Sequence, residues 1–174
     1  MILGHLAFSY ILTQVTRLFG WELSGSEIAL VMIAGSLIDL DLFVTFFIKK
    51  GISHRNFITH TPLGVFLIWL IFMVSLGQYF SFEADILVLM ALLGHLVMDD
   101  SGYWLCRLGL QHIDNCSRIS WLYPFKRYNN IGLMKRLGDV GGFFSDKYLK
   151  VAKASNILEV LLIIIAFSLF TYGR

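Results

Sequence analysis

The apolar stretch "IALVMIAGSLIDLDLFVTFFI", residues 28–48, decides the fold class of this chain. As an α-helix its 21 residues would reach about 31 Å, which is enough to cross the hydrocarbon core of a bilayer. Two carboxylates, Asp39 and Asp41, lie inside the stretch, and an ionisable group within a membrane span needs a partner or a function. The stretch therefore predicts a membrane helix with a polar site.

The rest of the chain is also strongly apolar. Of its 174 residues 57% are hydrophobic and 15% are charged, whereas a soluble domain has about 25% charged residues. We predict an all-α fold, a polytopic transmembrane helix bundle of about five helices that forms a single integral membrane domain over residues 1–174. The predicted spans are residues 1–19, 28–48, 63–82, 86–106 and 157–172.

The basic residues predict the orientation of this bundle. Twelve of the fourteen Lys and Arg residues fall within 49–61 and 107–153, and the positive-inside rule places such segments in the cytoplasm. The expected protein thus lies in the cytoplasmic (inner) membrane of a bacterium or archaeon, with its N-terminus inside, its C-terminus outside and a long basic cytoplasmic segment at 107–153. Cys106 and Cys116 are then expected to stay reduced, without a structural disulfide. The basic segment has no nucleic-acid reading motif, so its partner is expected to be the lipid bilayer.

This topology brings the polar residues of the spans to one half of the bundle. His95 and Asp99 are four residues apart and share a helix face. Asp39 and Asp41 are two residues apart, so on a regular helix they point in different directions. Either the helix loosens near Gly35 and Ser36, or one carboxylate binds an ion and the other supports the site. The candidates are His5, Asp39, Asp41, His54, His60, His95 and Asp99.

Imidazole and carboxylate together suit Zn²⁺, and also Mn²⁺ or Fe²⁺, so we expect a site for one or two divalent ions. Arg55 offers bidentate binding of a phosphate. Simpler roles are also open: His5 could snorkel from the end of a helix, and Asp100 is expected to be a solvated carboxylate at a helix end. His112 and Asp114 resemble ordinary loop residues. The chain contains no serine-hydrolase elbow and no His-Glu-x-x-His motif.

The motifs "GHL" (4–6), "GSLIDLD" (35–41), "HRNFITH" (54–60), "GHLVMDD" (94–100) and "WLYPF" (121–125) occur in this order. The series resembles the LexA-regulated, membrane-bound metal-dependent hydrolase family, which is thought to be related to the zinc-dependent phospholipase C and single-strand nuclease superfamily. Ile38 and Asn56 replace a proline and a glycine of the family pattern, and the segment from Gly102 to Ser120 is longer than the pattern expects. The resemblance implies metal-site roles for the same seven histidines and aspartates.

The expected function is a membrane-embedded, metal-dependent hydrolase, a phosphoesterase that acts on a lipid or another phosphoester at the cytoplasmic face. Asp41 is the expected general base, and Arg55 the group that stabilises developing negative charge. Two alternatives stay open. One is a metal-ion or proton transporter that uses the same residues, and the other is a non-catalytic membrane protein with a structural metal site.

Overall fold

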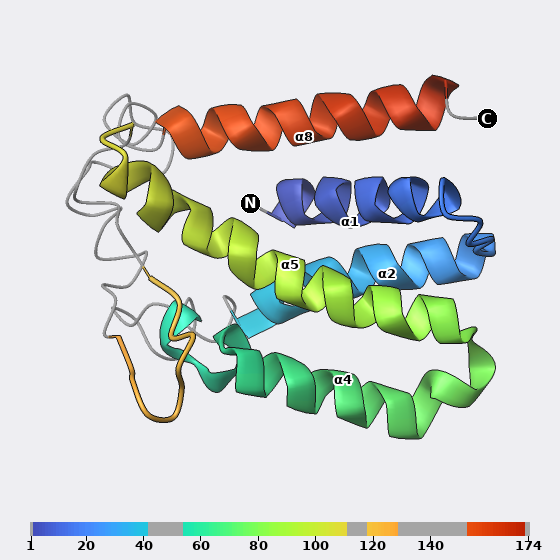
Figure 1. Ribbon diagram of the computed structural model, residues 1–174, viewed down its shortest axis with the longest axis horizontal. Coiled ribbons are helices and arrows are strands. Elements are labelled where there is room, and N and C mark those ends of the chain that lie inside the picture. The colour runs from blue at the N-terminus through green and yellow to red at the C-terminus, as the bar shows by residue number, and fades with distance from the viewer. Residues whose placement is uncertain (1, 42–53, 111–117, 129–152, 173–174) are drawn as a thin grey trace.

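The computed structural model describes residues 2–41, 54–110, 118–128 and 153–172, and every regular element among them is a helix (Figure 1). The prediction of an all-α fold is therefore confirmed. The long helices are α1 (Ile2–Arg17), α2 (Gly25–Leu37), α4 (Pro62–Leu76), α5 (Phe82–Arg107) and α8 (Lys153–Tyr172). The short 3₁₀ helices are η1 (Ile38–Leu40), η2 (His54–Asn56), η3 (Ile58–His60) and η4 (Gly77–Tyr79).

Helix α5 is the centre of the bundle. It packs against α1, α2, α4 and α8, and α1 in turn lies between α2 and α8 (Figure 1). The buried apolar residues Val88, Leu92 and Leu96 recur every four residues along one face of α5 and belong to the same core as Val31 of α2 and Val65 of α4. This spacing is that of a helix face buried in a core.

Polar caps fix the ends of three helices at defined residues. Ser24 and Glu27 form a reciprocal capping box at the start of α2. Glu27 also accepts a hydrogen bond of 2.8 Å from the backbone amide of Ser81, the N-cap of α5. Thr61 caps α4, whose first residue is Pro62, a residue suited to a first helical turn. The hydrogen bond between Glu27 and Ser81 thus joins the start of α2 to the start of α5.

Among the described residues, two segments are long and apolar enough to cross a membrane, Pro62–Tyr79 and Ala154–Tyr172. Both expose most of their side chains on the outside of the bundle, as a helix in contact with lipid would. The expectation of five spans is not confirmed, because the other long helices described do not pass this test. Helices α1 and α2 have 16 and 13 residues, shorter than a span of about 20 residues, and residues 42–48 of the predicted span 28–48 lie outside the described residues.

One expectation about cysteine is wrong. Cys106 lies on the buried side of α5, close to its end, and is disulfide-bonded. The expectation of a reduced thiol rested on the cytoplasmic location inferred from loop charge, and it took no account of the local packing. Cys116, the other cysteine of the chain, lies outside the described residues.

Candidate metal centre

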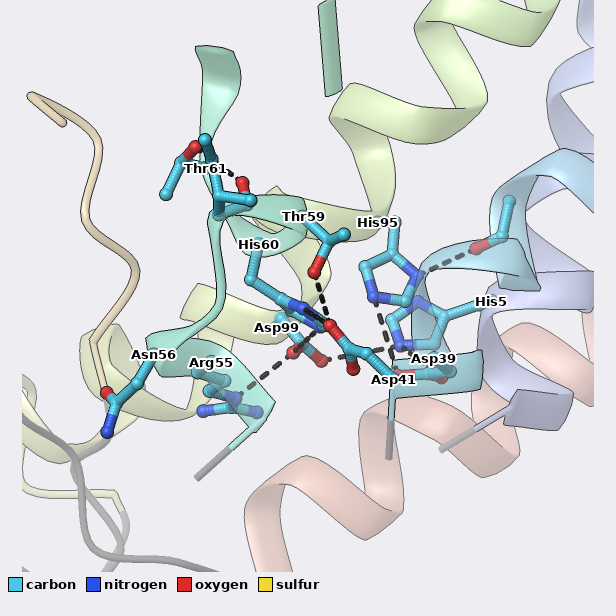
Figure 2. A network of polar contacts seen from close by, with 12 residues as sticks. His5, Asp39, Asp41, Arg55, Asn56, Thr59, His60, Thr61, His95 and Asp99 are labelled. Atoms are coloured by element: carbon cyan, nitrogen blue, oxygen red, sulfur yellow. Dashed lines mark hydrogen bonds and ion pairs between the residues drawn. The ribbon is translucent and has the colours of Figure 1, made fainter. Parts of the chain in front are cut away.

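Side chains from five elements meet at the end of the bundle where α1 begins (Figure 2). α1 contributes His5 and α5 contributes His95 and Asp99, while the short helices η1, η2 and η3 surround them with polar groups. His5, His60, His95 and Asp99 are at most 1% exposed, and Asp39 is 5% exposed. A buried group of carboxylates and imidazoles is costly unless its members are paired or hold an ion.

The tautomer of His95 is fixed by the backbone of α2. Its Nδ1 lies 2.7 Å from the carbonyl oxygen of Gly35, and because a carbonyl only accepts, Nδ1 must donate. The lone pair is then on Nε2, which lies 3.6 Å from Oδ1 of Asp39. In histidines that ligate metals, one ring nitrogen typically donates a hydrogen bond to the protein, as Nδ1 does here, and the other binds the ion.

His60 is oriented in the same manner by a carboxylate. Its Nδ1 lies 2.9 Å from Oδ2 of Asp41, and its Nε2 lies 3.6 Å from Oδ2 of Asp99. The hydroxyl of Thr59 donates to the same oxygen of Asp41. Because Asp41 contacts the far nitrogen of His60, it supports that imidazole from behind.

His5 links the two carboxylates at the centre of the group. Its Nε2 lies 3.4 Å from Oδ1 of Asp99 and 3.8 Å from Oδ2 of Asp39. Its ring stacks on that of His95 with the centroids 3.9 Å apart. Neither ring nitrogen of His5 has a hydrogen-bond partner among the residues that the structure describes. The imidazole is therefore buried with its nitrogens available to a ligand.

These separations fit ligands of a shared ion better than hydrogen bonds. The contacts between Nε2 atoms and carboxylate oxygens are 3.4–3.8 Å long, beyond the range of about 2.7–3.2 Å for N–H···O bonds. Two ligands of a tetrahedral zinc ion, with bonds of about 2.0–2.1 Å, are roughly 3.3–3.4 Å apart. Two groups have donor atoms within 4.8 Å of one another: His5, Asp39 and His95, and His60, His95 and Asp99. The donor set and its spacing fit a divalent ion.

Arg55 lies against this group. Its guanidinium donates through Nε to Oδ2 of Asp99 at 3.0 Å, and the residue is only 8% exposed. The backbone oxygen of Asn56, the next residue, accepts a 3.0 Å hydrogen bond from Arg127. Arg55 thus compensates part of the negative charge of the buried carboxylates. The hydrogen bond from Arg127 to Asn56 joins η2, the helix of Arg55, to the segment that contains "WLYPF".

The structure brings together six of the seven candidate ligands, with Asp39 and Asp41 in different roles. Asp39 faces His5 and His95, and Asp41 faces His60. The two carboxylates point in different directions because they are two residues apart, which holds for the 3₁₀ turn of η1 as it does for an α-helix. The side chain of His54 lies outside the described residues, as do His112 and Asp114.

The expectation for Asp100 is wrong. It is 1% exposed, and its two oxygens accept hydrogen bonds from the amide of Ile119 at 2.9 Å and from the indole of Trp121 at 3.0 Å. A carboxylate at the end of a helix is usually solvated, but here the chain returns to cover it. Asp100 therefore anchors the "WLYPF" segment to α5.

Three contributors to the site were missed from the sequence. They are the carbonyl of Gly35, the hydroxyl of Thr59, and Glu159 of α8, which accepts a 3.1 Å hydrogen bond from the amide of Gly4 beside His5. Glu159 had a visible signal, since it is the one carboxylate in the apolar stretch 157–172. The carbonyl of Gly35 had none, because backbone contacts across sixty residues leave no trace in side-chain pattern.

Comparison with known families agrees with the membrane character of the chain. The family model described as YdjM inner membrane protein matches residues 1–174, so the chain belongs to this family. The comparisons with curated proteins and with solved structures gave no match.

Proposed function

We propose that this inner membrane protein is a metal-dependent hydrolase that cleaves a phosphoester of a lipid or of another substrate at the membrane surface. The observation that supports the proposal best is the buried alternation of imidazole nitrogens and carboxylate oxygens, 3.4–3.8 Å apart. Such an arrangement would be unfavourable in an apolar bundle without a cation to hold it together.

His5, Asp39, His60, His95 and Asp99 would hold the ion or ions. Three imidazoles and two carboxylates suit Zn²⁺, with Mn²⁺ as the second choice. His95 has a single nitrogen left for a ligand, because Nδ1 is bonded to Gly35. Asp99 directs its two oxygens toward different histidines, Oδ1 toward His5 and Oδ2 toward His60, so it would serve a site of one ion or of two.

A bound ion of this kind activates water near neutral pH and polarises a phosphoryl oxygen. The chain's own groups would supply the rest. Oδ1 of Asp41 is buried and has no hydrogen-bond partner among the described residues, so it is available to accept a proton as a general base. The terminal nitrogens of Arg55 would bind the phosphate and stabilise its developing charge, while Nε stays on Asp99.

A lipid substrate is favoured by the location of the site. The proposed ligands lie on α1, η1, η3 and α5, within a bundle whose outer helices, α4 and α8, expose apolar side chains. A substrate that partitions into the headgroup region reaches such a site by lateral diffusion. We therefore place phospholipids and lipid phosphates ahead of water-soluble phosphoesters.

The hydroxyl side chains of α1 give little support to the alternative of a metal-ion or proton transporter. Helix α1 buries Ser9, Thr13 and Thr16 along the side that continues from His5. Thr13 and Thr16 donate their hydroxyl hydrogens to carbonyls of their own helix, at 2.7 and 3.0 Å. Hydroxyls bonded in this way are common in packed membrane helices and do not form a relay.

The test is a metal count on protein purified in mild detergent, for the wild type, His60→Ala and Asp99→Ala. We expect one or two zinc or manganese ions per chain in the wild type and fewer in both variants. Glu22→Gln, which changes an exposed carboxylate in the turn between α1 and α2, is the control and should keep the full count. Absence of metal from the wild type after loading with zinc and with manganese would contradict the proposal.

Hydrolysis is then measured on the same preparations with a chromogenic phosphodiester, a phospholipid and a lipid phosphate. Turnover that is lost in both ligand variants and retained in Glu22→Gln supports a hydrolase. A full metal count without turnover of any of these substrates, together with unfolding on chelation, would indicate the structural metal site instead.

The face of the membrane is a separate part of the proposal. Loop charge favours the cytoplasm, whereas a disulfide at Cys106 is more typical of an oxidising compartment such as the periplasm. We propose the cytoplasmic face, with the C-terminus outside. Alkaline phosphatase fused after Arg174 should be active, because this enzyme requires an oxidising compartment. An inactive phosphatase fusion, together with activity of a reporter that works only in the cytoplasm, would overturn this orientation.

A further inference from the structure

We propose that Gly35 is a positioning residue of the metal centre, which holds α1 at the required distance from α2 and fixes the tautomer of His95. The inference rests on the proposed function, since it concerns how the same ligands are placed. Gly35 lies in α2, four residues before Asp39, so it belongs to the same segment as one of the carboxylates.

The first line of evidence is the space around Gly35. A Cβ atom added there would lie 1.9 Å from Oγ of Ser9, 3.1 Å from Cβ of Ser9 and 3.5 Å from the carbonyl oxygen of His5. Ser9 is fully buried, one helical turn after His5. Its hydroxyl could rotate away from a methyl group, but the contact with its Cβ would still force α1 and α2 apart by a few tenths of an ångström.

A shift of that size matters at this site. Metal–ligand distances in proteins stay within about 0.2 Å of their preferred values. His5 is on α1 and Asp39 follows α2, so separating the helices lengthens the 3.8 Å gap between His5 Nε2 and Asp39 Oδ2. The stacked contact of His5 on His95 would open at the same time.

The second line of evidence is the carbonyl of Gly35. It accepts the 2.7 Å hydrogen bond from Nδ1 of His95 and so leaves the lone pair of Nε2 directed at Asp39. The same residue therefore governs the position of His5 through its missing side chain and the orientation of His95 through its backbone. Displacing α2 would disturb both imidazoles together.

The experiment compares Gly35→Ala, Ser9→Gly, the double variant and Gly25→Ala. Gly25 is the matched control, because it lies in the same helix and nothing would touch a Cβ added there. Zinc affinity is measured by competition with a chelator, on protein whose helical content and elution volume match the wild type. We expect Gly35→Ala to lose tenfold or more in affinity, and Ser9→Gly and Gly25→Ala to stay within threefold of the wild type.

The double variant gives the decisive comparison. Removing the Ser9 side chain removes both close contacts, and the next atom, the His5 carbonyl oxygen, lies at the ordinary separation of 3.5 Å. Affinity should then return to within threefold of the wild type, which a general loss of stability would not predict. Unchanged affinity in Gly35→Ala, or a double variant that binds no better than the single one, would overturn the proposal.

A second readout needs neither metal nor a variant. Nitrogen NMR of histidine-labelled, metal-free wild-type protein at pH 8 reports the tautomer of each imidazole. His95 should be protonated on Nδ1, and protonation on Nε2 would overturn the role given to the Gly35 carbonyl. If the wild type bound no metal, the proposed hydrolase would fail while this measurement would still decide the packing and hydrogen-bond role of Gly35.

Discussion

Asp41 tests whether the metal centre depends on a carboxylate that contacts the far nitrogen of one of its histidines. Its Oδ2 accepts the 2.9 Å hydrogen bond from Nδ1 of His60, while Nε2 of the same ring faces Asp99. Replacing such a supporting carboxylate typically weakens metal binding by about 10–100-fold, or roughly 1.4–2.8 kcal/mol. We expect Asp41→Ala to fall in this range. Asp41→Asn should lose less, because its amide oxygen can still accept the hydrogen bond.

The assay is calorimetric titration of metal-stripped protein with Zn²⁺ in the presence of a competing chelator. Asp99→Ala is the reference for a lost ligand and should bind too weakly to titrate, whereas Thr59→Val, which keeps the contact between Asp41 and His60, should stay within about threefold of the wild type. Asp41→Ala with wild-type affinity would refute the supporting role. Loss as complete as in Asp99→Ala would show that Asp41 binds the ion directly.

Three further predictions concern stability. Asp100→Ala should lower the free energy of unfolding by about 2–4 kcal/mol, because two buried donors, on Ile119 and Trp121, lose their acceptor. Thermal unfolding measures this loss, and zinc affinity within twofold of the wild type is its control. Hydrogen bonding to Ser81 lowers the pKa of Glu27 from 4.5 to about 2, so this carboxylate stabilises the fold above pH 4.5 and the contribution disappears as the pH falls through 2. The difference in melting temperature between the wild type and Glu27→Gln should therefore shrink between pH 4.5 and pH 2, and a constant difference would contradict this. Zinc at about 100 times its dissociation constant should raise the free energy of unfolding by about 2.7 kcal/mol, and a chelator should reverse the rise in melting temperature.

Much of the local structure could be predicted from the sequence. Four of the long helices, α1, α4, α5 and α8, overlap most of the stretches predicted for them, because helix formation and apolar periodicity depend on neighbouring residues. The predicted helix 28–48 is confirmed only in its first part, since α2 ends at Leu37 and residues 42–48 lie outside the described residues. The spacing of His95 and Asp99 on α5 likewise places both side chains in the same cluster. The prediction of five membrane spans is not confirmed, since two segments of the described part of the chain are both long and apolar enough to cross a membrane.

The sequence by itself determined that this is an all-helical chain that gathers histidines and aspartates at one end of its apolar helices. Only the tertiary structure decided which of these residues face one another as candidate ligands and which support the site. Asp39 faces His5 and His95 whereas Asp41 faces His60, and Asp100 is buried because the chain folds back over it. The tautomer of His95 depends on the carbonyl of Gly35, sixty residues earlier in the chain. Side-chain pattern reports burial and local geometry, whereas these roles depend on contacts between segments far apart in sequence, which exist only once the helices have packed.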